Sequence, residues 1–146
     1  MVQERFKLIC ASYLLLIKDN KILFGLRQNT GYMDGFYHLP AGHKEEGESN
    51  LTCLTREIKE ELGIEIDSKK AKFVHGMHRR ESDERVDWFF EVREYRGNIK
   101  NMEPEKCVEL KWFDLNNLPE NIVPYAKQAV ENYKKAIYYS QFGWDD

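Results

Sequence analysis

Three glutamates, Glu57, Glu60 and Glu61, lie on one face of a helix predicted over residues 49–62. At about 100° per residue they fall within an arc of about 100°. Like charges three or four residues apart destabilise a helix by roughly 0.2–0.5 kcal/mol per pair, so helix formation does not account for them. Clustered carboxylates are the ligands that a hard divalent cation such as Mg²⁺ requires. The spacing therefore predicts a cation site, and the alternative is a solvated acidic face.

A glycine-bracketed acidic loop, residues 42–48, leads into this helix. Gly42 and Gly47 would let the backbone approach a ligand closely. The N–H groups of such a loop and of a helix start favour phosphate oxygens. A phosphate-facing loop beside a metal-binding helix face is an arrangement for phosphoryl transfer.

The elements that must position this segment alternate between strands and helices. The nearly continuous apolar run at 6–17 predicts a strand covered on both faces, and residues 21–27 predict a second strand after a polar turn. Ser49 can cap the helix start and Gly63 can end it. The other expected elements are a short extended piece at 36–40, a hairpin of 71–79 and 85–96, a strand at 108–114 and a helix at 123–139. This order predicts a mixed α/β domain.

The composition is typical of a globular protein and argues against a membrane-spanning or nucleic-acid-binding one. A length of 146 residues predicts one domain spanning residues 1–146, and 42% apolar with 32% charged residues is typical of a globular chain. The net charge of −3 gives no bulk positive field for a nucleic acid polymer or an anionic membrane. No apolar run approaches the roughly 20 residues that a membrane span needs. An anionic small substrate would therefore need local cations or a metal to bind.

The cysteines and the N-terminal residues indicate the cellular compartment in which the protein works. Cys10, Cys53 and Cys107 are an odd, widely spaced set without metal-ligand spacing, as expected in a reducing compartment. The apolar stretch at 8–17 resembles a signal sequence, but Glu4 interrupts the basic start and no small-residue cleavage site follows. We expect a cytoplasmic protein.

The loop and helix together carry a family pattern. Gly42, five residues, Glu48, seven residues and the run from Arg56 to Ile64 match the pattern G-x5-E-x7-R-E-U-x-E-E-x-G-U, with U aliphatic. This resembles the Nudix box at every fixed position. His38-Leu39-Pro40 before the box, and Trp112 and Pro119 after it, extend the similarity from about residue 8 to 137. The resemblance implies the Nudix α/β/α sandwich, with a mixed β-sheet between helices.

The resemblance also implies roles for the box residues. Glu57 and Glu61 match the principal metal ligands, and Glu60 is the expected third. The backbone carbonyl of Ala41, where many members carry Gly, is a further metal ligand, and Gly42 belongs to the substrate loop. Arg56 matches the residue that pairs with a box carboxylate and orients it. Glu48 matches the first box glutamate, which either binds metal through water or braces the loop.

A base must deprotonate or orient the attacking water. In some family members it is the box glutamate that matches Glu57, and in others it is a carboxylate on a loop outside the box. Glu103 and Glu105 lie in such a loop here, and Glu105 is the preferred candidate. Arg27 and Arg79 end predicted strands and are candidates for binding the substrate's phosphates, with an exposed strand end as the alternative for Arg79.

The family reaction is hydrolysis of a nucleoside diphosphate linked to another group. ADP-ribose hydrolases often carry Pro about 16 residues after the box, and dinucleoside polyphosphate hydrolases often carry Tyr at 16–18. Neither residue stands at that spacing, around Arg79 to Ser82. The segment 101–106 resembles MutT-type members and nucleoside-triphosphate diphosphatases. The resemblance therefore favours Mg²⁺-dependent conversion of a nucleoside triphosphate, oxidised and non-standard ones included, to the monophosphate and pyrophosphate, with Mn²⁺ as a second usable cation.

Two alternatives stay open. One is hydrolysis of another diphosphate, such as a nucleotide sugar, ADP-ribose, a dinucleoside polyphosphate or a pterin triphosphate. The other is an inactive nucleotide-binding regulatory module, against which the retained box carboxylates count. The expected partner is a small nucleotide, with no nucleic acid polymer and no membrane, and the resemblance makes a homodimer an option. The aromatic C-terminal stretch at 138–144 is expected to fold back over the domain or to support an interface.

Overall fold

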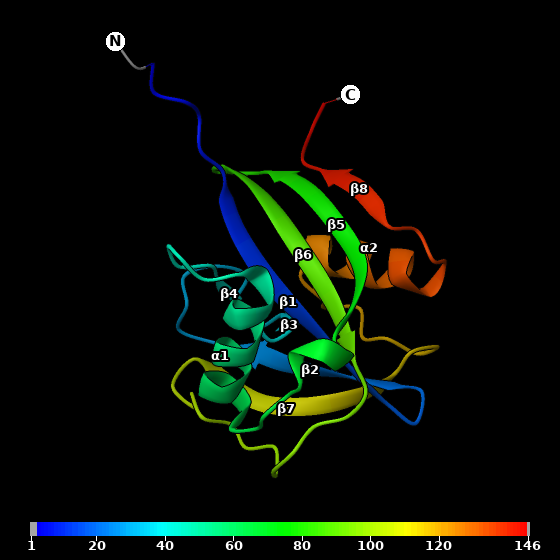
Figure 1. Cartoon of the computed structure of the whole chain (residues 1–146). Helices are drawn as coiled ribbons and strands as arrows, with labels where there is room; N and C mark the ends of the chain where they lie inside the picture. Colours follow the sequence, from blue (N-terminus) through cyan, green and yellow to red (C-terminus); the bar gives the residue numbers. More distant parts are fainter. Residues whose placement is uncertain (1–2, 146) are drawn as a thin grey trace.

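The computed structural model describes residues 3–145 and is built around one long central strand (Figure 1). That strand is β1 (Ile9–Lys18). The other strands are β2 (Lys21–Arg27), β3 (Tyr37–His38), β4 (Ala41–His43), β5 (Lys72–Arg80), β6 (Glu84–Val92), β7 (Cys107–Asp114) and β8 (Tyr139–Phe142). The helices are α1 (Asn50–Leu62), a single 3-10 turn at Ser68–Lys70, and α2 (Pro124–Lys134).

The sheet is mixed, as predicted. Its strands follow the order β3-β2-β1-β6-β5-β8, while β4 pairs with β1 and β7 pairs with β2. β1 runs parallel to β6 and antiparallel to β2 and β4. The short pairing with β4 sets Gly42 opposite Ser12. The backbone at 41–43 is thereby fixed to the central strand just before the loop that leads into α1.

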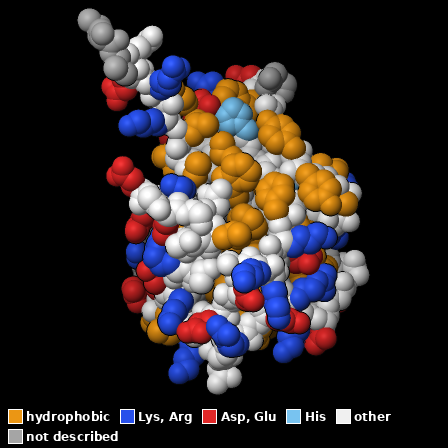
Figure 2. All heavy atoms as spheres, in the orientation of Figure 1, with side chains coloured by type: hydrophobic (Ala, Val, Ile, Leu, Met, Phe, Trp, Pro, Cys, Tyr) orange, Lys and Arg blue, Asp and Glu red, His pale blue; other side chains and the backbone are white. Residues whose placement is uncertain are grey.

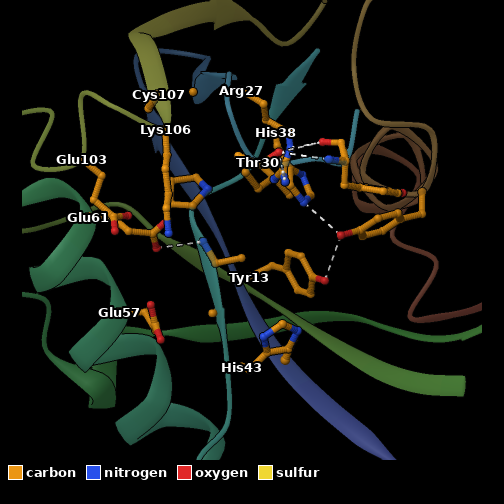
Figure 3. A pocket seen from close by; sticks show the side chains of 18 of the residues that line it. Tyr13, Arg27, Thr30, His38, His43, Glu57, Glu61, Glu103, Lys106 and Cys107 are labelled. Atoms are coloured by element: carbon orange, nitrogen blue, oxygen red, sulfur yellow. Dashed lines mark hydrogen bonds between the residues drawn. The ribbon is translucent and has the colours of Figure 1, made fainter. Parts of the chain in front are cut away.

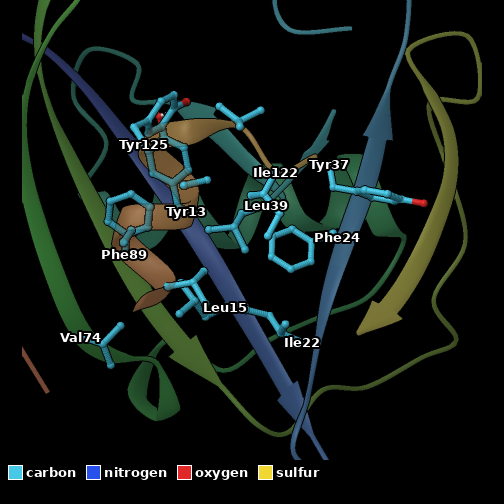
Figure 4. Close-up of a cluster of buried hydrophobic side chains, with 14 of the residues drawn as sticks. Tyr13, Leu15, Ile22, Phe24, Tyr37, Leu39, Val74, Phe89, Ile122 and Tyr125 are labelled. Atoms are coloured by element: carbon cyan, nitrogen blue, oxygen red, sulfur yellow. Dashed lines mark hydrogen bonds between the residues drawn. The ribbon is translucent and has the colours of Figure 1, made fainter. Parts of the chain in front are cut away.

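The two helices cover opposite faces of the sheet, so the predicted α/β/α sandwich is confirmed (Figure 1). β1 is buried on both faces because its side chains alternate between two cores. Tyr13, Leu15 and Ile17 join the core under α2, which Figure 4 shows in close-up. Leu14 and Leu16 join the core under α1.

Helix α1 begins and ends where its capping residues predict. The side chain of Ser49 accepts a hydrogen bond from the backbone N–H of Thr52, and Gly63 ends the helix in the left-handed conformation at φ 70°. Leu54, Ile58 and Leu62 are buried on one face. This packing fixes the rotation of the helix, so the glutamate face points away from the core.

The C-terminal helix is shorter than the predicted range of 123–139. Helix α2 ends at Lys134, and Ala136 takes a left-handed backbone conformation at φ 56° that stops it. The chain then returns as β8 and pairs in parallel with β5, so the expectation that the aromatic stretch folds back is confirmed (Figure 1). The side chain of His75 on β5 contacts β8 through Ser140 Oγ at 2.7 Å.

The face of the molecule drawn in Figure 2 carries a broad apolar area. Figure 2 shows hydrophobic side chains gathered over β6, β5 and β8, with charged side chains concentrated around the loops below. Phe73 of β5 and Tyr139 of β8 are among the exposed large apolar residues. Within residues 3–145, no helix has the length and apolar character that crossing a membrane requires.

Candidate active site

An open cavity of about 880 Å³ lies beside α1 and extends to the N-terminal end of α2 (Figure 3). Its walls come from β1, β2, the segment from β3 to the box loop, the β5–β6 hairpin and the loop before β7. The carboxylates of α1 lie at one end, and Tyr13 and His38 lie at the other. The central strand therefore joins an acidic end of the cavity to a neutral polar end.

The acidic end brings together Glu57, Glu61 and Glu103. Glu61 accepts a hydrogen bond from the backbone N–H of Ala41 at 3.2 Å. Burial, with the charges of Glu57 and Glu103, raises the pKa of Glu61 well above its usual range. Burial also raises the pKa of Glu57. Their negative charges are buried and repel one another, and a bound cation would stabilise them.

Arg56 links the box loop to helix α1 through hydrogen bonds to Glu48 and Glu57. Its guanidinium donates to both oxygens of Glu48, at 2.7 and 3.1 Å, and to Glu57 Oε1 at 2.8 Å. The hydrogen bond from Arg56 lowers the pKa of Glu48 to about 2. Glu48 also accepts from the backbone N–H of Glu45 at 2.8 Å. This geometry fits the bracing role for Glu48 and the orienting role for Arg56.

Glu60 lies at the edge of this arrangement. Its side chain is 57% exposed and lies 3.4 Å from Arg56 Nη1. It is not among the residues that line the cavity, whereas Glu103 is. Glu103 is therefore the third carboxylate that lines the acidic end, and the metal-ligand role of Glu60 stays a prediction.

The loop before β7 places Glu103 and Glu105 in different surroundings. Glu103 lines the cavity, and Glu105 does not. Glu105 instead contributes its backbone carbonyl, which accepts from Asn29 Nδ2 at 3.1 Å. The two side chains diverge because the loop turns here, with the N–H groups of Lys106 and Cys107 both bonded to the Glu103 carbonyl. Pro104, at the second position of this turn, is its local sequence signal.

Three basic residues line the cavity without a carboxylate partner among the described ion pairs: Arg27, Lys44 and Lys106. Arg27 donates to the Tyr32 carbonyl at 2.8 Å and to Thr30 Oγ1 at 2.9 Å, and its predicted contact with substrate stays a prediction. Lys106 also lines the cavity, and Figure 3 places it beside Glu61 and Glu103. Sequence reasoning missed Lys106, whose only signal was its place next to the two loop glutamates.

Arg79 lines the cavity, but its guanidinium is already engaged. It is 5% exposed and donates to Asp87 Oδ2 at 2.7 Å and to Glu81 Oε1 at 2.6 Å. Its Cζ lies 3.6 Å from the centroid of the Tyr125 ring. These contacts hold the guanidinium against Asp87, Glu81 and Tyr125, and the phosphate-binding role of Arg79 stays a prediction.

The neutral end is a chain of buried polar groups. The hydroxyl of Tyr13 lies 2.9 Å from Asp87 Oδ1 and 3.0 Å from the hydroxyl of Tyr125. That hydroxyl lies 2.9 Å from His38 Nε2 (Figure 3). Burial lowers the pKa of His38 to about 3, so its imidazole is neutral. No sequence pattern indicated that β1, β3 and α2 would join these side chains.

Comparisons with known proteins identify the family of this chain. The NUDIX domain family matches residues 9–133. A NAD-capped RNA hydrolase NudC from Stutzerimonas stutzeri is 28% identical over 94% of this chain and 46% of its own length. An ADP-ribose pyrophosphatase from Methanocaldococcus jannaschii is 36% identical over 83% of this chain and 70% of its own. The chain thus spans less than half the length of the NudC relatives it matches.

Solved structures share the fold. A MutT NUDIX hydrolase from Burkholderia pseudomallei superposes with a TM-score of 0.79 at 23% identity, covering 86% of this chain and 98% of that one. The solution structure of the E. coli ORF135 protein gives a TM-score of 0.75 at 23% identity, covering 88% and 90%. With the complete box and this arrangement of its carboxylates, the chain belongs to the Nudix hydrolase family.

Proposed function

We propose that the protein is a divalent-cation-dependent pyrophosphohydrolase that converts a nucleoside triphosphate to its monophosphate and pyrophosphate. The observation that carries this is the charge layout of one cavity. Three carboxylates share its acidic end with Lys106, while Arg27 lines the cavity beside Thr30 and His38 at the other end. Such a layout suits a polyphosphate bound between a cation and basic side chains, with its nucleoside in the neutral end.

The residues of the acidic end fit a Mg²⁺ ion by their chemistry. Glu57, Glu61 and the carbonyl of Ala41 would hold the ion, with Glu60 placed to act through water. Within residues 3–145 no three acidic, His or Cys side chains are gathered as a closed metal cluster. Mg²⁺ commonly keeps waters and takes phosphate oxygens beside one or two carboxylates, so a closed cluster is not required. The ion would neutralise phosphate charge and lower the pKa of a bound water.

The protein's own side chains supply the remaining steps. Arg56 holds Glu57 in place through their 2.8 Å contact and leaves the other Glu57 oxygen free for the cation. Glu103 faces the same space and would take the proton from the attacking water. The water oxygen bonds to phosphorus as the bond to the bridging oxygen breaks, and the leaving phosphate group carries away the electron pair. Lys106 and Arg27 would bind the phosphate oxygens that gain charge.

A second candidate is a diphosphate that links a nucleoside to another group. The relative from M. jannaschii, named as an ADP-ribose pyrophosphatase, favours this class. The absence of the downstream Pro and Tyr markers at Arg79 to Ser82 favours the triphosphate. Both classes share the acidic end and the same metal chemistry, so they differ only in what fills the rest of the cavity.

Product analysis tests the proposal. The purified protein is incubated with Mg²⁺, with Mn²⁺ or with EDTA, together with a panel of nucleoside triphosphates, nucleotide sugars, ADP-ribose and dinucleoside polyphosphates. Monophosphate plus pyrophosphate from triphosphates, lost in EDTA and in Glu61→Gln, supports the leading function. Turnover of the diphosphate-linked compounds alone supports the second candidate. Nucleotide binding without any turnover supports a regulatory module.

We also propose that the enzyme acts on a small nucleotide in the cytoplasm. A cavity of this size takes a small nucleotide, and the net charge of −3 offers no field for a nucleic acid polymer. The three free cysteines fit a reducing, cytoplasmic setting. The homodimer implied by the family resemblance stays a prediction.

A further inference from the structure

His43 of β4 presents an imidazole ring to the cavity, and an arginine holds one of its nitrogens. The residue is exposed and lines the cavity, and Figure 3 shows its ring on the opposite side of Tyr13 from His38. Its Nε2 lies 3.0 Å from Nη1 of Arg85 on β6. Its other nitrogen, Nδ1, has no hydrogen-bond partner among the described residues. One polar atom of an exposed, cavity-lining side chain is therefore left for a ligand.

The contact with Arg85 determines which nitrogen of His43 carries the ring hydrogen. A guanidinium donates hydrogen bonds and cannot accept them, so His43 Nε2 must accept in this contact. Nε2 therefore keeps its lone pair, and the single hydrogen of the neutral ring lies on Nδ1. The unpartnered atom of His43 is thus a donor, and it requires an acceptor from the ligand.

His43 is held at both its side chain and its backbone, so this donor has a defined position. Arg85 donates from Nε and Nη2 to the two carboxylate oxygens of Asp83, at 2.9 and 2.6 Å, which fixes its guanidinium. The backbone of His43 pairs with Ala11 of β1, and its carbonyl accepts from Arg56 Nη2 at 3.3 Å. A donor that is fixed before the ligand arrives loses little freedom on binding.

The surroundings of His43 favour an anion. The next residue, Lys44, also lines the cavity, and its Nζ bonds the backbone carbonyl of Glu45 at 3.1 Å. Lys44 has no carboxylate partner among the described ion pairs, so its charge is available to a ligand. On the other side of His43 in the chain, Gly42 packs directly against the carboxyl group of Glu57. His43 and Lys44 therefore lie next to the expected cation and add a donor and a positive charge there.

Building on the proposed function, we propose that His43 Nδ1 and Lys44 Nζ bind the two terminal phosphates of the nucleoside triphosphate, which leave as pyrophosphate. Phosphate oxygens are charged acceptors, so they match a fixed donor beside a cation. The bound substrate then runs from the neutral end, past the cation at Glu57, to His43. ADP-ribose and nucleotide sugars would place a sugar at this position instead. These two residues therefore favour the triphosphate over the second candidate.

Product inhibition tests the assignment. His43→Leu should raise the Ki of pyrophosphate at least about tenfold, as loss of a hydrogen bond to a charged group implies, and should change the Ki of the nucleoside monophosphate by less than about twofold. His43→Asn should keep the pyrophosphate Ki within about threefold of the wild-type value, because the amide nitrogen of Asn stands near the place of Nδ1. An unchanged pyrophosphate Ki in His43→Leu, or an equal loss of affinity for both products, would overturn the proposal.

Arg85 is a positioning residue for His43, and its variant has a matched control. Arg85→Met removes the group that holds Nε2, so the pyrophosphate Ki should rise about threefold or more. Arg93→Met is the control, because Arg93 bonds Glu91 at 3.1 Å, does not line the cavity and should leave both Ki values at the wild-type level. Equal effects of the two arginine variants would overturn the positioning role of Arg85.

A second measurement does not depend on turnover. Long-range ¹H–¹⁵N spectra of the histidine rings should show His43 with its hydrogen on Nδ1, its signals being identified by their absence in His43→Asn. Arg85→Met should lose this fixed tautomer. Pyrophosphate with Mg²⁺ should shift the Nδ1 resonance of the wild-type protein, whereas Mg²⁺ alone, or a nucleoside monophosphate with Mg²⁺, should not. A hydrogen found on Nε2, or an equal shift with Mg²⁺ alone, would overturn the proposal.

These readouts separate the two proposals. A selective shift of Nδ1 by pyrophosphate in a protein that cleaves no triphosphate would keep the anion site and reject the leading function. Triphosphate turnover with the same pyrophosphate Ki in the wild-type protein, His43→Leu and Arg85→Met would keep the function and reject the anion site.

Discussion

Gly42 and Glu57 share a space that has no room for a side chain on residue 42. A Cβ added to Gly42 would overlap the carboxyl group of Glu57. Gly42 lies on β4, opposite Ser12 of β1, and α1 packs against that edge of the sheet, so the backbone has little freedom to move away. The first glycine of the box is therefore required by the position of a carboxylate 15 residues later.

Gly42→Ala should therefore displace Glu57 and impair the site while the fold survives. We expect kcat to fall at least about tenfold and the Mg²⁺ concentration for half-maximal rate to rise, since a ligand displaced by about 1 Å can cost far more. Steady-state kinetics across a Mg²⁺ titration measure both effects. Gly76→Ala is the matched control, because its Cβ meets Phe73 at an ordinary 3.4 Å. Normal Mg²⁺ dependence in Gly42→Ala would contradict this account.

Glu103 and Glu105 form a natural pair of test positions, because the loop before β7 directs only the first into the cavity. Glu103→Gln should lower kcat by roughly 10²–10⁴-fold if it takes the proton from water. Glu105→Gln should change kcat by less than about twofold. Rates at saturating substrate and Mg²⁺ for the two variants distinguish them, and the opposite ranking would restore Glu105 as the base.

Helix α1 was predictable from the sequence because its signals are local. Ser49, Gly63 and the spacing of Leu54, Ile58 and Leu62 lie within one segment, and each acts on its own neighbours. The glutamate face followed from the same geometry. The two-sided burial of β1 was readable too, since an uninterrupted apolar run has no solvent-facing alternation.

The parts that sequence reasoning missed depend on contacts between distant segments. The helix predicted over 123–139 ends at Lys134, because the chain turns back there so that β8 can pair with β5. Arg79 resembled a free strand-end cation because nothing in its own segment shows that Asp87 lies beside it on β6. Glu103 and Glu105 were equivalent until the turn between them was known.

The buried carboxylates of the site should make the metal-free protein less stable than it would be without them. The pKa of Glu61 is raised by burial and by Glu57 and Glu103, so stability is lost as the pH rises from its unfolded value of about 4.5 toward the raised folded value. Glu61→Gln should therefore melt at a higher temperature than the wild-type protein in EDTA near pH 7.5.

Mg²⁺ should reverse that order. At 100 times its Kd a bound ion contributes about 2.7 kcal/mol, so the wild-type Tm should rise by several degrees while that of Glu61→Gln changes little. Thermal unfolding with EDTA and with Mg²⁺ measures both shifts. An equal response of the two proteins to Mg²⁺ would remove Glu61 from the metal site.

The ion pair of Arg56 with Glu48 should contribute to stability with a defined pH dependence. The pKa of Glu48 is lowered to about 2 from an ordinary 4.5, so the contribution is fully present above about pH 4.5 and is lost as the pH falls toward 2. Glu48→Gln should be less stable than the wild-type protein at pH 6, and the gap should narrow at pH 3. Urea unfolding at the two pH values tests this, and a gap independent of pH would show that the carboxylate charge has no part in it.

Arg79 and Asp87 should behave as a buried pair whose halves need each other. Asp87 is fully buried, and Arg79 is its only cationic partner among the described ion pairs. Arg79→Ala would leave that carboxylate uncompensated, and breaking such a pair costs about 3–5 kcal/mol. Adding Asp87→Asn should recover part of the loss, because the neutral amide removes the unpaired charge. Urea unfolding of the two single variants and the double variant gives the coupling energy. A phosphate-binding Arg79 would instead raise KM with little loss of stability, and its effect would not depend on residue 87.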